Sequence, residues 1–189
     1  MQTATLNTTY NRGSVFLHWA IALFLIANIV LGFSRESFGS SFEDKVMFVH
    51  KSLGFSVLGL GILRVWWRIK HRPPPFDPVL RLWEVAVARA THALLYFTML
   101  AIPLTGWLIV SSSARAKSFF GIFIFPALPV PKSKALHDFW GGTHETLTWF
   151  AVGLIVLHVL GALMHLLIND RPSIGRMWPG RGRTSKVDL

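Results

Sequence analysis

The 189-residue chain contains no cysteine. This absence excludes disulfides, thiolate nucleophiles and iron–sulfur clusters, so any metal chemistry has to rest on other side chains, chiefly histidine. Charged residues are also scarce, at 15%, whereas hydrophobic residues make up 52% of the chain. A chain with so little charge and so much apolar content is not an ordinary soluble domain. We therefore interpret it as an integral membrane protein.

Four apolar segments are long enough to cross the hydrocarbon core of a bilayer, which needs ~20 mostly apolar residues. They are Val15–Phe33, Val46–Trp67, Val85–Val110 and Thr143–Ile168. No small-residue cleavage site follows the first segment, so we expect a retained helix rather than a signal peptide. The sequence thus predicts an all-α fold: a transmembrane four-helix bundle formed by residues 1–179, with a basic, unstructured cytoplasmic tail at residues 180–189.

The basic residues flank the apolar segments. The formal net charge of +10 would suggest nucleic-acid binding in a soluble protein, but this placement is typical of membrane topology, and we expect no nucleic-acid partner. One cluster surrounds the second connection and the other follows the fourth segment: Arg64, Arg68, Lys70, Arg72, Arg81 and Arg89, then Arg171, Arg176, Arg181, Arg183 and Lys186. By the positive-inside rule these ends face the cytoplasm, so both termini are predicted to be cytoplasmic.

One apolar run does not fit a membrane span. Phe119–Phe125 is too short to cross, and three prolines follow it, at Pro126, Pro129 and Pro131. We expect this run to lie in the outer membrane interface and to cap the bundle. His71 and His137 fall in connections, where we expect them to be solvated.

Two histidines lie fourteen residues apart in the fourth segment, His144 and His158. In a helix this spacing corresponds to about 21 Å of rise and leaves both rings within about 40° of one face. Under the predicted topology, His50 lies at the outer level of His144, and His18 lies at the inner level of His158. Each pair joins two helices across the bundle core, where helical bundles hold their cofactors.

The residues around these histidines favour haem over another metal. Zinc and di-iron sites use carboxylates or cysteines as metal ligands beside histidine. Glu84 and Glu145 lie at segment ends, with no matching set of ligands in the segments. His144-Glu145 begins like a zinc-protease motif, yet Thr148 occupies the position of its second histidine. The sequence therefore predicts two haems, each with two histidine ligands. His92 shares the inner level and is an alternative partner of His158.

Several motifs together resemble a known family. They are Tyr10–Trp19, Leu63-Arg64 with Pro73-Pro74 beyond, His92–Tyr96, Pro103–Gly106, and His144–Leu147 with His158. In this combination, from Tyr10 to Pro179, the chain resembles the bacterial cytochrome b561 family, which is related to the dihaem cytochrome b subunits of membrane hydrogenases and formate dehydrogenases. The resemblance implies a protein of the bacterial inner membrane with two haems b ligated by His18, His50, His144 and His158.

The resemblance also implies electron transfer between a donor at the outer face and ubiquinone, with superoxide as a donor assigned within the family. His92, His165 and Arg12 are candidates for the quinone side, because quinone reduction needs nearby proton donors. The outer-loop cations are candidates for attracting an anionic donor: Arg115, Lys117, Lys132 and Lys134.

Two other functions stay open at this point. The chain could instead be the haem-bearing membrane anchor of a larger dehydrogenase or hydrogenase, with the long outer loop as a docking surface. It could also be a small transporter or assembly factor whose histidines relay protons. The sequence leaves the oligomeric state open, a homo-oligomer included.

Overall fold

The computed structural model describes residues 3–7, 9–35, 40–76, 80–113, 118–167, 174–178 and 184–188. Its main elements are four long helices: α1 (Arg12–Ser34), α2 (Ser40–Lys70), α3 (Leu82–Ser111) and α4 (Lys134–Leu167). Each is long and apolar enough to cross a membrane. The predicted all-α membrane bundle is therefore confirmed, and each helix covers its predicted segment except for Ile168, which lies outside the described residues.

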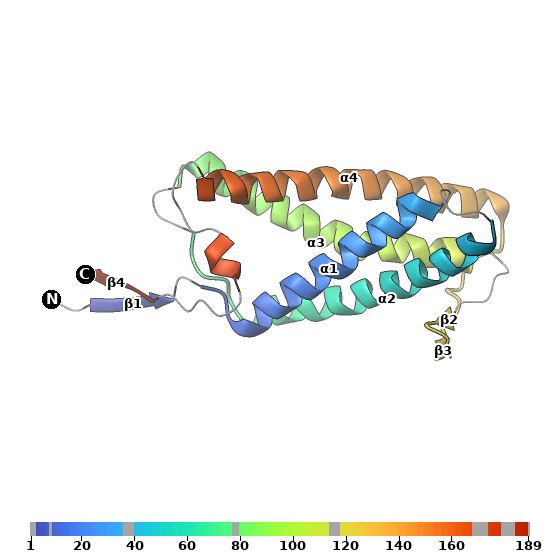
Figure 1. Cartoon of the computed structure of the whole chain (residues 1–189), viewed down its shortest axis with the longest axis horizontal. Helices are drawn as coiled ribbons and strands as arrows, with labels where there is room; N and C mark the ends of the chain where they lie inside the picture. The colour runs from blue at the N-terminus through green and yellow to red at the C-terminus, as the bar shows by residue number, and fades with distance from the viewer. Residues whose placement is uncertain are drawn as a thin grey trace.

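The helices alternate in direction and form an antiparallel bundle (Figure 1). We call the end at which α1 and α3 begin the terminal end, and the opposite end the hairpin end. Close backbone packing joins α1 to α2, α2 to α3, and α3 to α4. Within the described residues, α1 and α2 approach α4 mainly through side chains. Of the other three helices, α3 thus lies closest to the backbone of α4.

Local sequence signals set where the helices begin. Asn11 caps α1, because its side-chain oxygen accepts a hydrogen bond of 2.8 Å from the backbone N–H of Ser14. At the start of α3, the carboxylate of Glu84 accepts a bond of 2.7 Å from the backbone N–H of Arg81. Such caps satisfy N–H groups that have no partner inside the helix and are each worth about 1 kcal/mol.

Large apolar side chains cover the outside of the bundle as well as its inside. Leu23, Ile62 and Leu160 are all more than half exposed, whereas the central buried cluster is small and consists of Ile21, Val57 and Met99. Exposed apolar surface on this scale marks contact with lipid rather than with water. The apolar outer face agrees with the membrane class inferred from composition.

The short apolar run at the hairpin end folds as a β-hairpin. Strands β2 (Ser118–Phe119) and β3 (Phe123–Ile124) pair across a turn in which Phe120 and Gly121 have positive φ. The hairpin is attached to α2, since the N–H of Phe120 donates to Ser52 Oγ at 3.0 Å. Its tip exposes apolar side chains, and its place in the membrane interface stays a prediction.

Two sequence-based expectations about the ends of elements were wrong. The helix α4 begins at Lys134, so His137 lies in its first turn, half-buried, with Nδ1 3.2 Å from the carbonyl oxygen of Ile109. The helix starts early because the chain leaves the proline-rich segment at this point, and the ion pair between Lys134 and Asp138 supports its first turn.

The tail is not entirely unstructured. Strand β4 (Thr184–Asp188) pairs in antiparallel fashion with β1 (Thr3–Asn7), so the two ends of the chain lie together at the terminal end (Figure 1). Threonine and valine favour extended backbone, and each strand satisfies backbone groups of the other. A 3₁₀ turn, η2 (Ile174–Met177), precedes this pair.

Candidate functional site

At the hairpin end, the rings of His50 on α2 and His144 on α4 face each other, with centroids 6.3 Å apart and planes at 74°. The Nδ1 atom of His50 lies 3.0 Å from the carbonyl oxygen of Asn28, and that of His144 lies 2.9 Å from the carbonyl oxygen of Ile102. A carbonyl oxygen only accepts hydrogen bonds, so each ring donates from Nδ1. The lone pair of Nε2 is therefore free to bind a metal.

A glycine lies against each of these two rings. A Cβ atom on Gly32 would lie 3.2 Å from Cε1 of His50, and one on Gly106 would lie 3.3 Å from Cε1 of His144. Each glycine follows the residue that supplies the carbonyl by four positions, so one helical turn offers both the hydrogen bond and the space for the ring. A carbonyl oxygen and a glycine four residues later thus position each histidine of this pair.

Thr105 offers a second hydrogen-bond acceptor to the ring of His144. Its hydroxyl donates to the carbonyl oxygen of Ile102 at 2.7 Å, and Oγ1 lies 3.1 Å from Nδ1 of His144. Sequence reasoning did not identify Thr105, Gly32 or Gly106 as site residues. The available signal was the position of Thr105 and Gly106 two and three residues after Pro103, within an apolar segment.

The second pair lies toward the terminal end. The ring centroids of His18 on α1 and His158 on α4 are 6.2 Å apart, and the ring of His92 on α3 is 5.3 Å from that of His158. Within the described residues, none of these three rings has a hydrogen bond to a backbone carbonyl. The structure therefore brings the four predicted ligands together in the two predicted pairs. It also places the predicted alternative, His92, next to His158.

The ring separations can be compared with those of a metal held between two histidines. A metal–nitrogen bond of about 2.0–2.1 Å, plus about 1.1 Å from nitrogen to ring centre on each side, separates the two centroids by about 6–6.5 Å. The pairs His50–His144 and His18–His158 both have this separation, whereas His92 lies too close to His158. The residues present therefore fit two haems with two histidine ligands each.

Other metal sites do not fit the described residues. Among them, no group of three or more histidine, aspartate or glutamate side chains is placed to hold a metal ion directly. Zinc and di-iron sites in helical proteins need such groups. The paired histidines therefore point to a metal whose other ligands come from a macrocycle.

The candidates for the quinone side are spread out. His92 lies beside His158, but His165 lies seven residues further along α4, toward the terminal end, and Arg12 is exposed at the first residue of α1. His92 is in ring contact with a predicted ligand, His158.

The predicted outer-loop cations lie in part at the hairpin end. Lys132 and Lys134 line a cavity of about 420 Å³ together with Ser112, Ser113, Ser133 and His137. Lys134 is already paired with Asp138, so Lys132 contributes the less compensated charge. Arg115 and Lys117 lie outside the described residues.

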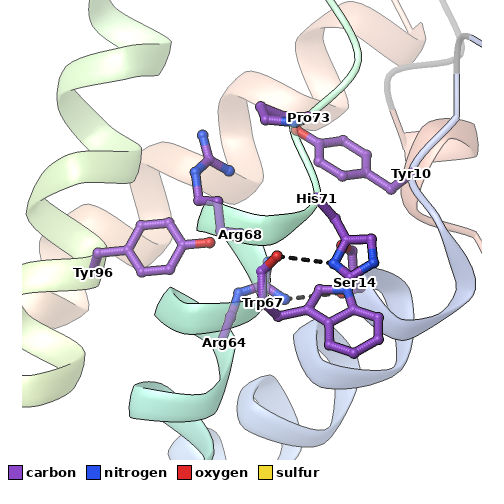
Figure 2. A pocket seen from close by; sticks show the side chains of 8 residues that line it. All are labelled: Tyr10, Ser14, Arg64, Trp67, Arg68, His71, Pro73 and Tyr96. Atoms are coloured by element: carbon purple, nitrogen blue, oxygen red, sulfur yellow. Dashed lines mark hydrogen bonds between the residues drawn. The ribbon is translucent and has the colours of Figure 1, made fainter.

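Arg64, one of the cations grouped around the second connection, makes a contact inside the bundle. Arg64 lies within the predicted segment Val46–Trp67 and within α2, where it is half-buried, and its Nη1 donates to the carbonyl oxygen of Ser14 at 2.9 Å. With Arg68 and Tyr96 it lines a small pocket at the terminal end (Figure 2). The helix continues to Lys70 and so carries this part of the basic cluster inside the bundle.

Known proteins resemble this chain over most of its length. The family model of the prokaryotic cytochrome b561 matches residues 9–180. Two Escherichia coli (strain K12) proteins, cytochrome b561 homolog 2 and homolog 1, are 32% and 30% identical over 89% and 91% of this chain and 90% and 98% of their own lengths. A Yersinia pestis protein named probable superoxide oxidase CybB is 25% identical over 90% of this chain and 96% of its own. The chain is thus a bacterial multi-pass membrane b-type cytochrome and belongs to the prokaryotic cytochrome b561 family.

Proposed function

We propose that this protein carries electrons between the two faces of the membrane and holds two haems b for this purpose. His50 and His144 would hold one haem, and His18 and His158 the other. The observation that carries the proposal is that both pairs have the ring separation that a shared metal requires. When bound, a haem with two histidine ligands supplies one-electron exchange and has no open position for oxygen.

The helices fix the two levels relative to each other. Both levels include a ligand from α4, so one rigid element sets their spacing at about 21 Å of helical rise. At the hairpin end the carbonyls of Asn28 and Ile102 orient the rings in advance. At the terminal end such bonds are not seen in the described residues, and we expect this pair to be ordered less tightly before it is loaded.

We further propose a direction. Lys70, Arg72 and Arg81 lie at the terminal end, which makes that end cytoplasmic by the positive-inside rule. The hairpin end then faces outward, and superoxide is the proposed donor there; the name of the Yersinia pestis relative supports this choice. The overall reaction is two superoxide anions plus ubiquinone plus two protons, giving two dioxygen molecules and ubiquinol. His92 and His165 are the proposed proton donors of quinone reduction, and Arg12 is a further candidate for the quinone side.

Rapid mixing of the oxidised protein with superoxide, and of the reduced protein with a ubiquinone analogue, tests this function. We expect fast haem reduction in the first case and fast reoxidation in the second. Reduction only by a co-purified dehydrogenase, and none by superoxide, would favour the alternative in which the chain is an electron-conducting anchor subunit.

Superoxide reduction should depend on salt. Attraction between exposed cations and an anion is screened within about 8–10 Å at physiological ionic strength, so the bimolecular rate should fall as salt is added. Replacing Lys117, Lys132 and Lys134 together by glutamine should cause a similar fall at low salt without changing haem content. The matched control replaces Lys70, Arg72 and Arg81 at the other end, which changes the net charge equally. If both triple variants slow the reaction equally, net charge rather than position sets the rate.

Thr105 should tune the haem at the hairpin end. In Thr105→Val the Nδ1–H of His144 keeps the Ile102 carbonyl but loses the hydroxyl oxygen, so the ring becomes a weaker electron donor and the ferric form is less favoured. We expect the reduction potential of one haem to rise in a redox titration, with the other unchanged. Thr105→Ser, which keeps the hydroxyl, should restore the original value. A shift of equal size in the serine variant would contradict this role.

A further inference from the structure

Two arginines from successive turns of α2 share a pocket at the terminal end (Figure 2). The side chains that line the pocket include Tyr10, Ser14, Arg64, Trp67, Arg68 and Tyr96. The guanidinium carbons of Arg64 and Arg68 lie 5.8 and 5.4 Å from the centroid of the Tyr96 ring. One aromatic ring from α3 thus lies close to both cations.

These two cations are not neutralised by the protein around them. Like charges four residues apart in a helix repel each other. Within the described residues, neither Arg64 nor Arg68 is paired with a carboxylate; Arg64 donates to a backbone carbonyl, and both contact the Tyr96 ring. Cations in a membrane-spanning helix are costly unless they meet an anion or a water-filled space. The pocket is therefore complementary to an anion.

The pocket adjoins the histidines at the terminal end. Ser14, whose carbonyl accepts from Arg64, lies one turn before His18 on the same face of α1. An anion held by Arg64 would thus lie next to whatever the histidines hold.

The size of the pocket limits the kind of anion. Its volume is about 10 Å³, which is about enough for one water molecule. A quinone ring or a whole lipid headgroup does not enter such a space, whereas a single carboxylate oxygen at the end of a flexible arm can, with the rest of the arm outside. Haem b has two such arms, its propionates, and arginine binds carboxylates through paired, charge-assisted hydrogen bonds.

We propose that Arg64 and Arg68 form a clamp for a propionate carboxylate of the haem held by His18 and His158. The clamp rests on the proposed function, because it needs a haem at this level. It gives Arg64 a binding role in place of the topological role expected from the sequence. It also gives the terminal-end site an anchor that does not depend on carbonyl bonds to its histidine rings.

The test measures how fast the purified full-length protein gives up haem to an excess of a soluble haem-binding acceptor. The double variant Arg64→Gln with Arg68→Gln should lose one of its haems about tenfold faster or more, because it lacks two charge-assisted bonds. The matched control is Arg89→Gln, which removes an exposed cation on α3 that contacts Phe76 instead. The control should lose haem at the original rate.

A second arm uses protein loaded with haem dimethyl ester, whose propionates carry no charge. The arginine substitutions should then have no effect, because the group they bind is missing. An equal acceleration with haem and with its ester would mean that the arginines only support helix packing, and the proposal would be wrong. No acceleration with haem would also overturn it.

Two further outcomes are distinguishable. If the double variant retains haem normally but loses bound phospholipid in a phosphorus assay, the anion is a lipid phosphate and the clamp is wrong. If the original protein holds no haem at this level, the proposed function fails before the clamp is tested. Should the glutamine variant not fold, the pair Arg64→Lys and Arg68→Lys keeps the charge but not the paired geometry. It should lose haem faster than the original, and only when the propionates are free.

Discussion

Replacing His50 or His18 by alanine should remove one haem and leave the other. Each haem would then be held by only one histidine of its pair, and we expect a single histidine bond to be too weak to retain it. His50→Ala should thus abolish the haem at the hairpin end, and His18→Ala the haem at the terminal end. Reduced-minus-oxidised spectra with haem quantification measure both effects.

The corresponding substitutions in α4 should affect both haem sites. His144 and His158 lie on one helix that serves both levels, so His144→Ala and His158→Ala should also weaken the neighbouring site. His137→Ala is the control, because this ring lies in the first turn of α4 and belongs to neither pair. If His92→Ala abolished the terminal-end haem while His18→Ala kept it, the ligand at that level would be His92.

Substitution of Gly106 by valine should remove the hairpin-end haem without touching a ligand. Even a Cβ atom would lie 3.3 Å from Cε1 of His144, and the two further methyl groups of valine force the ring away from the Ile102 carbonyl. The Nε2 atom then no longer points at His50. We expect loss of one haem and retention of helix content by circular dichroism.

The matched control for this change is Gly142→Val. Gly142 lies in α4 close to His144 in sequence, but it is exposed, and nothing lies within 4 Å of the position that a Cβ would take. Both substitutions change helix propensity by a similar amount, so a difference between them reports the contact with the ring. Equal haem loss in the two variants would show that helix stability, not ring position, is responsible.

The membrane class and the four helices could be predicted because they depend on local properties. Hydropathy over about 20 residues identifies a span, and the separation of His144 and His158 along one helix needs no tertiary information. Matching them with His50 and His18 needed only an alternating topology. The structure brings these four rings together in the predicted combination.

The remaining features depend on contacts between helices. The pairing of Asn28 and Gly32 with His50 is fixed by the rotation of α1 against α2, which no sequence period reports. Arg64 lies within the predicted segment Val46–Trp67, but its contact with the carbonyl of Ser14 could not be predicted, because it also depends on how α1 packs against α2. The alternative between His18 and His92 stayed open because both occupy the same level. Only the separations between ring centroids distinguish them.

Haem content tests the central claim most directly. The purified full-length chain should contain two haems b per polypeptide, released intact by acidic organic solvent, because without cysteine no thioether link can form. Quantification as the pyridine haemochrome against protein concentration measures this ratio. Two non-covalent haems per chain is the result that the paired histidines predict, and a ratio of one or none in the folded protein would contradict the account.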